Sequence, residues 1–263
     1  MRRSPVYTIT MCPIIPTHQM LSIAPNLLTT QRLILRQWRE SDRPAFARLN
    51  ADPAVRQFFP KCLTRDESDA DAAWIEKTIA ERGWGFWAVE VKGSDAIAAG
   101  ESSATTVGGF DATARGGSGI TACGEAGVAS PHVVAAADAP RAPFIGFVGL
   151  SVPSFTSHFT PCVEIGWRLA KEYWGNGYAS EAAVACLRFG FEKLTLKQIV
   201  AFTAPLNKRS IAVMERIGMS RNPADDFDHP NIPPGDPLQR HVLYRMNRSD
   251  WDHLYVPRDA QLS

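Results

Sequence analysis

Apolar and polar positions along the chain follow two periods, and these periods predict an ordered series of strands and helices. Apolar residues at every second position are typical of strands, and apolar residues three and four positions apart are typical of helices. The patterns predict strands over residues 30–36, 85–91, 144–150, 163–169, 198–203 and 241–246. They also predict a helix that opens at residues 41–44, and helices over residues 64–82, 179–194 and 207–218. This order predicts an α+β fold, with helices flanking a mixed sheet.

A segment of low complexity, residues 93–142, separates the second and third predicted strands. Nine of the nineteen glycines of the chain fall within residues 93–127, with Ala, Ser and Thr between them. Such a composition buries too little apolar surface to offset the entropy of ordering the backbone. We therefore expect a mostly disordered insert within a single domain of residues 27–250. A small recognition insert that orders on binding is the alternative.

The two ends of the chain are expected to be tails. Residues 1–26 contain short apolar pieces interrupted by prolines, which is not the pattern of a signal peptide. Residues 251–263 follow the last predicted strand. Met1 and Met20 both stay open as the first residue of the protein.

Composition narrows the class of protein. The chain is 45% hydrophobic and 21% charged, with a formal net charge of +1, which gives no support to a nucleic-acid or membrane partner. No apolar run approaches the ~18–20 residues of a membrane span, so we expect a cytoplasmic protein. The five cysteines are widely spaced and form no C-x-x-C pair. Neither a disulfide framework nor a metal centre is therefore expected.

A Gly-x-Gly turn, Gly175-Asn176-Gly177, joins the strand over residues 163–169 to the next helix. Glycines let the backbone turn sharply and approach a ligand closely. A helix N-terminus adds unpaired N–H groups and partial positive charge, so the turn is a candidate phosphate or pyrophosphate site. An ordinary strand-to-helix turn is the alternative. No Lys follows Gly177, as a P-loop requires, and Ser180 stands at the third glycine of a dinucleotide fingerprint.

A second motif makes the first more specific. Residues 172–177 read Glu-Tyr-Trp-Gly-Asn-Gly, and residues 207–219 read Asn-Lys-Arg-Ser-Ile-Ala-Val-Met-Glu-Arg-Ile-Gly-Met. With these motifs separated by one helix and one strand, the chain resembles the GNAT superfamily of acetyl-CoA-dependent N-acetyltransferases. It is most similar to the branch that includes ribosomal-protein-alanine acetyltransferases. The resemblance covers about residues 29–95 and 143–248, and Glu172 departs from the Gln or Arg that opens the family's first motif.

The resemblance implies a GNAT-like fold and direct acetyl transfer from acetyl-CoA, without a metal, in a ternary complex. The implied acceptor is a primary amine of a small molecule or a protein N-terminus, and its identity stays open, as does assembly as a homodimer. The residues implied in binding acetyl-CoA come from the fourth predicted strand and from the two motifs: Trp167, Leu169, Trp174, Gly175, Asn176, Gly177, Tyr178, Ala179 and Asn207.

Glu164 is the candidate general base. Alternation along the strand puts Glu164, Gly166 and Arg168 on one face, and the resemblance implies that this strand borders the acceptor cleft. A carboxylate there can take the amine proton through a water. An ion pair with Arg168 is the structural alternative. Gly166 is a candidate bulge that would free a backbone N–H for the thioester carbonyl.

Ser210 is the candidate donor of a hydrogen bond to the departing thiolate. The family's usual tyrosine acid aligns with Met214, which cannot donate a proton. A serine hydroxyl one turn earlier can do so, although it can also bond back to the helix backbone. A strong acid is not required if the thiol has a pKa near ~8.5, the value for cysteine.

Asp225, Asp226 and Asp228 form an acidic loop before the last predicted strand. The loop lacks the glycine and distal glutamate of a calcium site. We expect either a solvated loop or one that attracts a cationic amine. Two other functions stay open: a non-catalytic acyl-CoA-binding regulatory module, favoured by Met214, and a dinucleotide-dependent oxidoreductase, disfavoured by Ser180.

Overall fold

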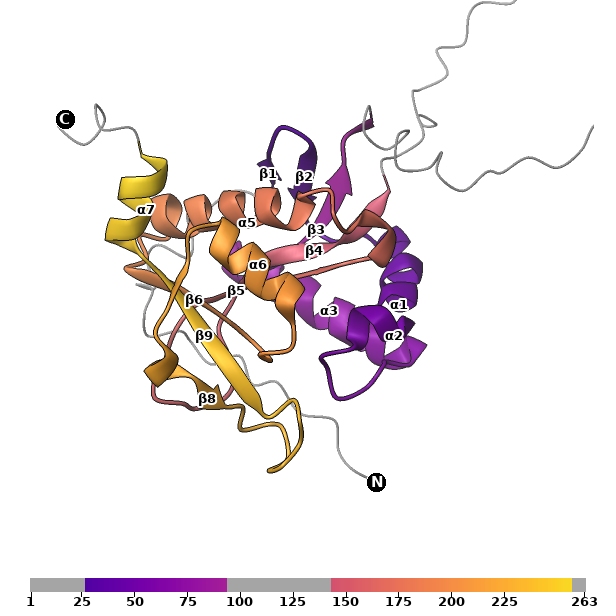
Figure 1. The fold of residues 1–263 in the computed structure, drawn as a ribbon. Coiled ribbons are helices and arrows are strands. Elements are labelled where there is room, and N and C mark those ends of the chain that lie inside the picture. Colours follow the sequence, from indigo (N-terminus) through magenta and orange to yellow (C-terminus); the bar gives the residue numbers. More distant parts are fainter. Residues whose placement is uncertain (1–26, 94–142, 257–263) are drawn as a thin grey trace, which may run out of the picture.

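A mixed sheet forms the centre of the molecule in the computed structural model, which describes residues 27–93 and 143–256 (Figure 1). The strand order is β1-β2-β3-β4-β5-β6-β9-β7, with β8 paired to β9. Every neighbouring pair is antiparallel except β5 and β6, which are parallel. The strands are β1 Leu28–Thr29, β2 Leu33–Arg36, β3 Phe86–Val91, β4 Phe144–Ser151, β5 Glu164–Leu169, β6 Gln198–Thr203, β7 Ser220–Arg221, β8 Phe227–Asp228 and β9 Arg240–Asn247.

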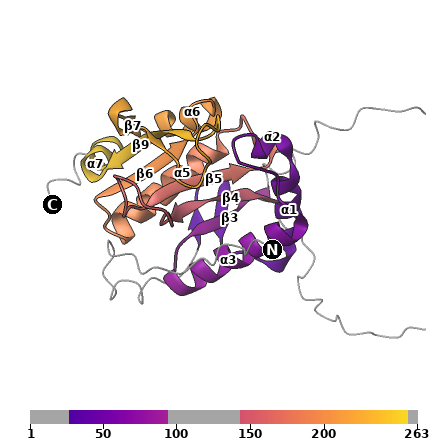
Figure 2. The same cartoon turned by 90° about the horizontal axis from the view of Figure 1, so that it is seen from below.

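Helices cover both faces of this sheet (Figures 1 and 2). Phe46 of α1 packs on Phe147 of β4, with 5.9 Å between ring centroids. Phe189, directly after α5, packs on Trp87 of β3 at 5.2 Å. Because Phe147 pairs with Ala88, next to Trp87, the two contacts lie on opposite faces. The helices are α1 Arg43–Ala51, α2 Pro53–Arg56, α3 Arg65–Arg82, α5 Tyr178–Arg188, α6 Lys208–Arg216 and α7 Arg248–Tyr255.

The predicted fold class is confirmed, and local sequence explains several boundaries. Thr64 caps α3 in a capping box with Glu67, and Gly83 ends the helix in the left-handed conformation. Helical structure covers nearly all of the range predicted as residues 179–194: the α-helix α5 ends at Arg188, and a π-helix follows directly over Phe189–Lys193. The predicted N-terminal tail and the insert, apart from Gly93, lie outside the described residues.

The predicted domain boundary at residue 250 falls inside helix α7, Arg248–Tyr255, which packs on the rest of the domain. Trp251 is fully buried and stacks on Phe191, with 5.5 Å between ring centroids. Tyr255 stacks on Trp251 at 4.5 Å and donates a hydrogen bond to the Ile217 carbonyl. This short helix has no long apolar stripe, so its packing depends on distant residues that a local pattern does not reveal.

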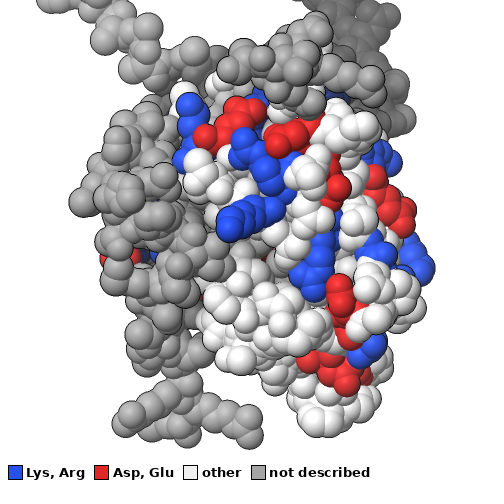
Figure 3. Space-filling model, turned by 90° about the vertical axis from the view of Figure 1, so that its left-hand side faces the viewer, with Lys and Arg blue, Asp and Glu red and all other residues white. Residues whose placement is uncertain are grey.

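Helix hydropathy and surface charge complete the description of the fold. Across residues 27–93 and 143–256, no helix is both long and apolar enough to span a membrane. On the face seen from the left of Figure 1, basic and acidic side chains are interspersed (Figure 3).

Candidate functional site

The turn between β5 and α5 has the geometry of an anion site. Gly175 and Gly177 have φ angles of +82° and +78°, in the left-handed region that favours glycine. Gly177 caps α5 without any side-chain cap, and the first helical bond runs from the Glu181 N–H to the Gly177 carbonyl at 3.0 Å. The N–H groups of the first helical turn are therefore free to hold an anion.

Beside this turn, the only parallel pair of strands in the described sheet stops pairing early. β5 and β6 pair at a single position, Glu164 opposite Val200, with a bond from the Val200 N–H to the Val163 carbonyl at 3.0 Å. β5 stays paired to β4 along its whole length. The backbone groups of β5 that point toward β6 beyond Glu164 therefore lack ladder partners. Apart from the Leu169 carbonyl, which accepts from the Trp174 indole, they are available to an extended ligand arm.

Aromatic and basic side chains hold the turn in place. The Trp174 indole N–H donates to the Leu169 carbonyl at 2.8 Å, and the Arg209 guanidinium lies 4.5 Å from the Trp174 ring centroid. The Arg32 guanidinium lies 4.8 Å from the Tyr178 ring centroid. Sequence reasoning missed both arginines. The one available indication was Arg209 in the first turn of α6, where the helix dipole disfavours a cation.

Most of the residues predicted to bind acetyl-CoA lie at this turn, and α6 brings Asn207 toward it. Trp174 to Ala179 form the turn and the start of α5, and Arg209 brings the start of α6, capped by Asn207, beside Trp174. Trp167 is partly exposed, on the opposite face of β5 from Glu164.

Glu164 is partly buried at the start of β5, at the single position where β5 pairs with β6. Its carboxylate makes no hydrogen bond or ion pair within residues 27–93 and 143–256, and burial raises its pKa to about 7. The alternative of an ion pair with Arg168 is wrong: the Arg168 Nη1 donates to the Asn50 Oδ1 of α1 at 2.8 Å. Glu164 is thus an unpaired carboxylate whose pKa suits proton transfer near neutral pH.

Gly166 does not form the predicted bulge, since β4 and β5 pair in continuous register through Gly149 opposite Gly166. A different constraint accounts for the glycine. A Cβ at this position would lie 3.1 Å from the Phe86 ring, so the ring packs directly over the strand.

Ser210 and Asn207 form a local network at the start of α6. The Asn207 Oδ1 accepts from the Ser210 N–H at 3.3 Å, and its Nδ2 donates to the Ser210 Oγ at 3.0 Å and to the Thr203 Oγ1 at 2.9 Å. Asn207 is therefore the N-terminal cap of α6. Because the Ser210 oxygen accepts a bond, its own hydrogen is free to be donated. Met214 is buried.

Each of the three aspartates in the acidic loop forms an ion pair with an arginine, which reduces the charge that could steer a cationic amine. Asp226 forms a two-point ion pair with Arg221. Asp225 pairs with Arg245 at 3.1 Å, and Asp228 pairs with Arg240 at 3.2 Å. The local sequence did not reveal the arginine partners of Asp225 and Asp228, because these arginines lie on β9, twelve or more positions along the chain.

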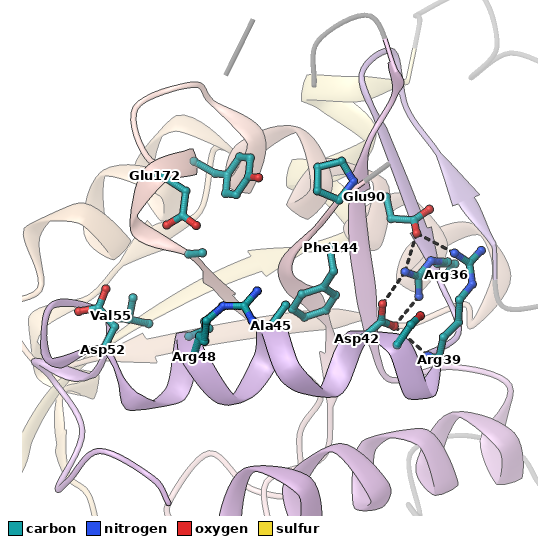
Figure 4. A pocket seen from close by; sticks show the side chains of 15 residues that line it. Arg36, Arg39, Asp42, Ala45, Arg48, Asp52, Val55, Glu90, Phe144 and Glu172 are labelled. Carbon is teal, nitrogen blue, oxygen red and sulfur yellow. Dashed lines mark hydrogen bonds and ion pairs between the residues drawn. The ribbon is translucent and has the colours of Figure 1, made fainter. Parts of the chain in front are cut away.

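A cavity of about 510 Å³ lies between α1 and the residues before the turn (Figure 4). One side holds a charged cluster in which Arg36 pairs with Asp42 at 2.7 Å and with Glu90 at 2.5 Å. Asp52 and Glu172 lie at the other side (Figure 4). None of the predicted site residues lines it. In the described part of the chain, no three His, Cys, Asp or Glu side chains gather in a potential metal site.

Comparison with known proteins gives relatives that match part of the chain. The uncharacterized protein YkkB of Bacillus subtilis (strain 168) is 44% identical over 84 residues, which make up 32% of this chain and 48% of that protein. The FsC-acetyl coenzyme A-N(2)-transacetylase of Aspergillus fumigatus is 32% identical over 98 residues, 37% of this chain and 41% of that protein. The chain thus spans about half or less of the length of these curated relatives.

Solved structures share the fold across most of the chain. An acetyltransferase of the GNAT family from Bacillus anthracis superposes with a TM-score of 0.56 at 20% identity, covering 85% of this chain and 99% of that one. The ribosomal-protein-S5-alanine acetyltransferase of Vibrio fischeri gives a TM-score of 0.54 at 15% identity, covering 86% and 98%. A family model described as an acetyltransferase (GNAT) domain matches residues 32–220. Since this match covers more than half of the sequence, the chain belongs to the GNAT acetyltransferase family.

Proposed function

We propose that this chain is an N-acetyltransferase that moves the acetyl group of acetyl-CoA directly to a primary amine, of a small molecule or a protein N-terminus. The observation that carries the proposal is the donor turn, residues 174–179. Its two left-handed glycines and uncapped helix N-terminus stand beside strands that stop pairing. A diphosphate with an extended arm matches that arrangement, since the turn offers N–H groups and β5 offers unpaired backbone.

Glu164 takes the proton of the attacking amine in this scheme. A primary amine such as lysine has a pKa near ~10.4 and must lose a proton before it attacks. Glu164 faces away from α5, its carboxylate is unpaired within the described residues, and its pKa lies at about 7. The ammonium first gives one proton to the carboxylate, directly or through one water. The neutral amine nitrogen then bonds to the thioester carbon, the C–S bond breaks, and the second proton that leaves the nitrogen as the amide forms neutralises the departing thiolate.

Ser210 stabilises the departing thiolate. Its oxygen accepts from Asn207, so its hydrogen can be donated to the sulfur. One neutral hydrogen bond is sufficient if the thiol has a pKa near ~8.5, because the thiolate then needs no strong acid. This explains how Met214 can occupy the usual tyrosine position.

Release of CoA thiol tests the proposal. The purified protein is incubated with acetyl-CoA and a panel of amines, thiol is measured with a chromogenic reagent, and acetylated product is identified by mass spectrometry. We expect thiol release that depends on an amine and that falls in Gly177→Val when acetyl-CoA is below saturation. Tight acetyl-CoA binding with no amine-dependent release would instead favour a non-catalytic acyl-CoA-binding module.

A further inference from the structure

Two arginines converge on the face of β5 that carries Glu164. The guanidinium carbons of Arg168 on β5 and Arg56 at the end of α2 lie 4.4 Å and 4.3 Å from the ring centroid of Phe59. Arg56 is only 8% exposed, whereas Phe59 is 36% exposed. The pair is therefore held in place by the protein and bordered by a ring that solvent reaches.

The hydrogen-bonding capacity of both guanidiniums is largely unused. Arg168 donates through Nη1 to Asn50, while its buried Nε has no partner. Arg56 donates through Nε to the Lys61 carbonyl at 2.9 Å. Within residues 27–93 and 143–256, neither guanidinium forms an ion pair. An arginine carries five N–H donors, and buried donors without partners are costly.

The cluster of Arg168 and Arg56 also carries excess positive charge. Burial, together with the nearby charge of Arg56, lowers the pKa of Arg168 to about 9. Asp71 of α3 is the carboxylate that acts on both arginines, and burial raises its pKa. Two cations with one incompletely compensating acid favour a further anion at this place.

This cluster is separate from the place for the donor phosphates. The donor turn opens α5, which covers the opposite face of the sheet. Arg168 instead shares its face with Glu164, and Gly166 between them has no side chain. Four residues along a strand span roughly 13 Å between Cα atoms, and the long side chains shorten the distance between the functional groups.

We propose that the acceptor is an amine that also carries a carboxylate, with the amine at Glu164 and the carboxylate held by Arg168 and Arg56. The inference rests on the proposed function and names the acceptor class of that same site. The planar guanidinium fork matches a carboxylate in two-point geometry. The spacing requires a spacer of about dipeptide length, as in a peptide or an ω-amino acid, rather than a single carbon.

Equilibrium binding tests the inference without turnover. Calorimetry on the full chain saturated with CoA compares ω-aminoalkanoic acids, from glycine to aminohexanoic acid, with their carboxamides. We expect the longer acids to bind at least about tenfold more tightly than their amides, the effect of one or two charge-assisted hydrogen bonds. Equal affinity within each pair, including the case in which neither member binds, overturns the inference.

Matched variants locate the effect. In Arg168→Met and Arg56→Met, the preference for the acid over the amide should largely disappear, while amide affinity and acetyl-CoA affinity stay as in the wild type. Arg168→Lys keeps a charge without the fork and should fall between them. Arg48→Met, an exposed arginine of α1, is the control. A preference that survives in both methionine variants overturns the assignment.

The two proposals fail separately. If thiol release never depends on an amine but the acids still bind more tightly than the amides, the acetyltransferase proposal fails and the anion site stands. If amines of every kind are acetylated without preference for a carboxylate, the anion site fails and the acetyltransferase proposal stands.

Discussion

The donor turn and the acceptor face of β5, the face that carries Glu164, Gly166 and Arg168, are built in different ways. The donor turn consists of consecutive residues whose backbone would do the binding under the proposed function, so glycine conformation and a helix start are sufficient to form it. The acceptor face draws on α1, α2 and β5, and its chemistry depends on which side chains remain unpaired. Backbone N–H groups are present whatever the neighbouring side chains are, so a backbone site survives changes in those side chains. A side-chain site instead depends on the identity of each residue that forms it.

The largest expected effect is on the acceptor face. Glu164→Gln should lower kcat/KM for the amine by about 10²–10⁴-fold, because the amide cannot accept a proton. In the wild type kcat/KM should rise with pH through about 7, the pKa of Glu164, and this step should vanish in the variant. Stopped-flow or steady-state thiol release against pH measures both. The control is Glu192→Gln, because Glu192 is an exposed carboxylate in the helical segment Phe189–Lys193 that follows α5. Unchanged rates at every pH would remove Glu164 from the mechanism.

A backbone substitution should break the donor turn without touching the acceptor face. Gly177→Val places a branched side chain at φ +78°, so the acetyl-CoA dissociation constant should rise at least about tenfold, equivalent to about 1.4 kcal/mol. Gly235→Val provides the matched control, since Gly235 has φ +85° in an exposed loop with no atom near its Cβ position. Calorimetry with both folded variants decides. Equal losses would show general strain rather than a lost site.

Removing the Ser210 hydroxyl should have a smaller effect. Ser210→Ala loses one hydrogen bond from a neutral hydroxyl to a sulfur that is only partly charged in the transition state, worth about 0.5–1.5 kcal/mol, so kcat should fall about two- to tenfold. The cap on α6 stays, because Asn207 accepts from the backbone N–H of residue 210. Acetyl-CoA affinity should therefore be unchanged. A kcat equal to that of the wild type would assign the hydroxyl to the helix alone.

Stability against pH gives an independent measure of the acceptor face. The folded-state pKa of Glu164, about 7, lies above the unfolded value of ~4.3. The folded state then binds the extra proton between these values, so this group's contribution to stability is full below about pH 4.3 and is lost as the pH rises to about 7. In the wild type, this group should lower the free energy of unfolding by about 1–3 kcal/mol between pH 5 and pH 8. The Glu164→Gln variant should lack this pH-dependent loss. Denaturant unfolding of both proteins at the two pH values measures it.

The smallest effect is expected in the acidic loop. Replacing Asp225, Asp226 and Asp228 with Asn should change the amine KM less than about twofold, because their charge is already balanced by arginines. The free energy of unfolding should fall by about 0–1 kcal/mol per exposed ion pair. A strong rise in KM that salt abolishes would restore electrostatic steering by this loop.

Local sequence was sufficient for the fold class, the boundaries of α3, the Gly-x-Gly turn and the position of Glu164 on its strand face. The fold class follows from the order of the predicted elements. The other three depend on residues within one turn or one strand: a capping box at Thr64, left-handed glycines, and alternation along β5. Such features follow from backbone geometry, so a one-dimensional pattern records them.

Only the tertiary structure decided which charges are paired. Arg168 looked like a partner for Glu164, but Asn50, 118 positions away, accepts its hydrogen bond. Asp225 and Asp228 looked like free charges, but strand β9 returns arginines to them. Burial and ion pairing depend on which distant segments the chain brings together, and they set both the pKa of Glu164 and the unsatisfied charge of Arg168 and Arg56.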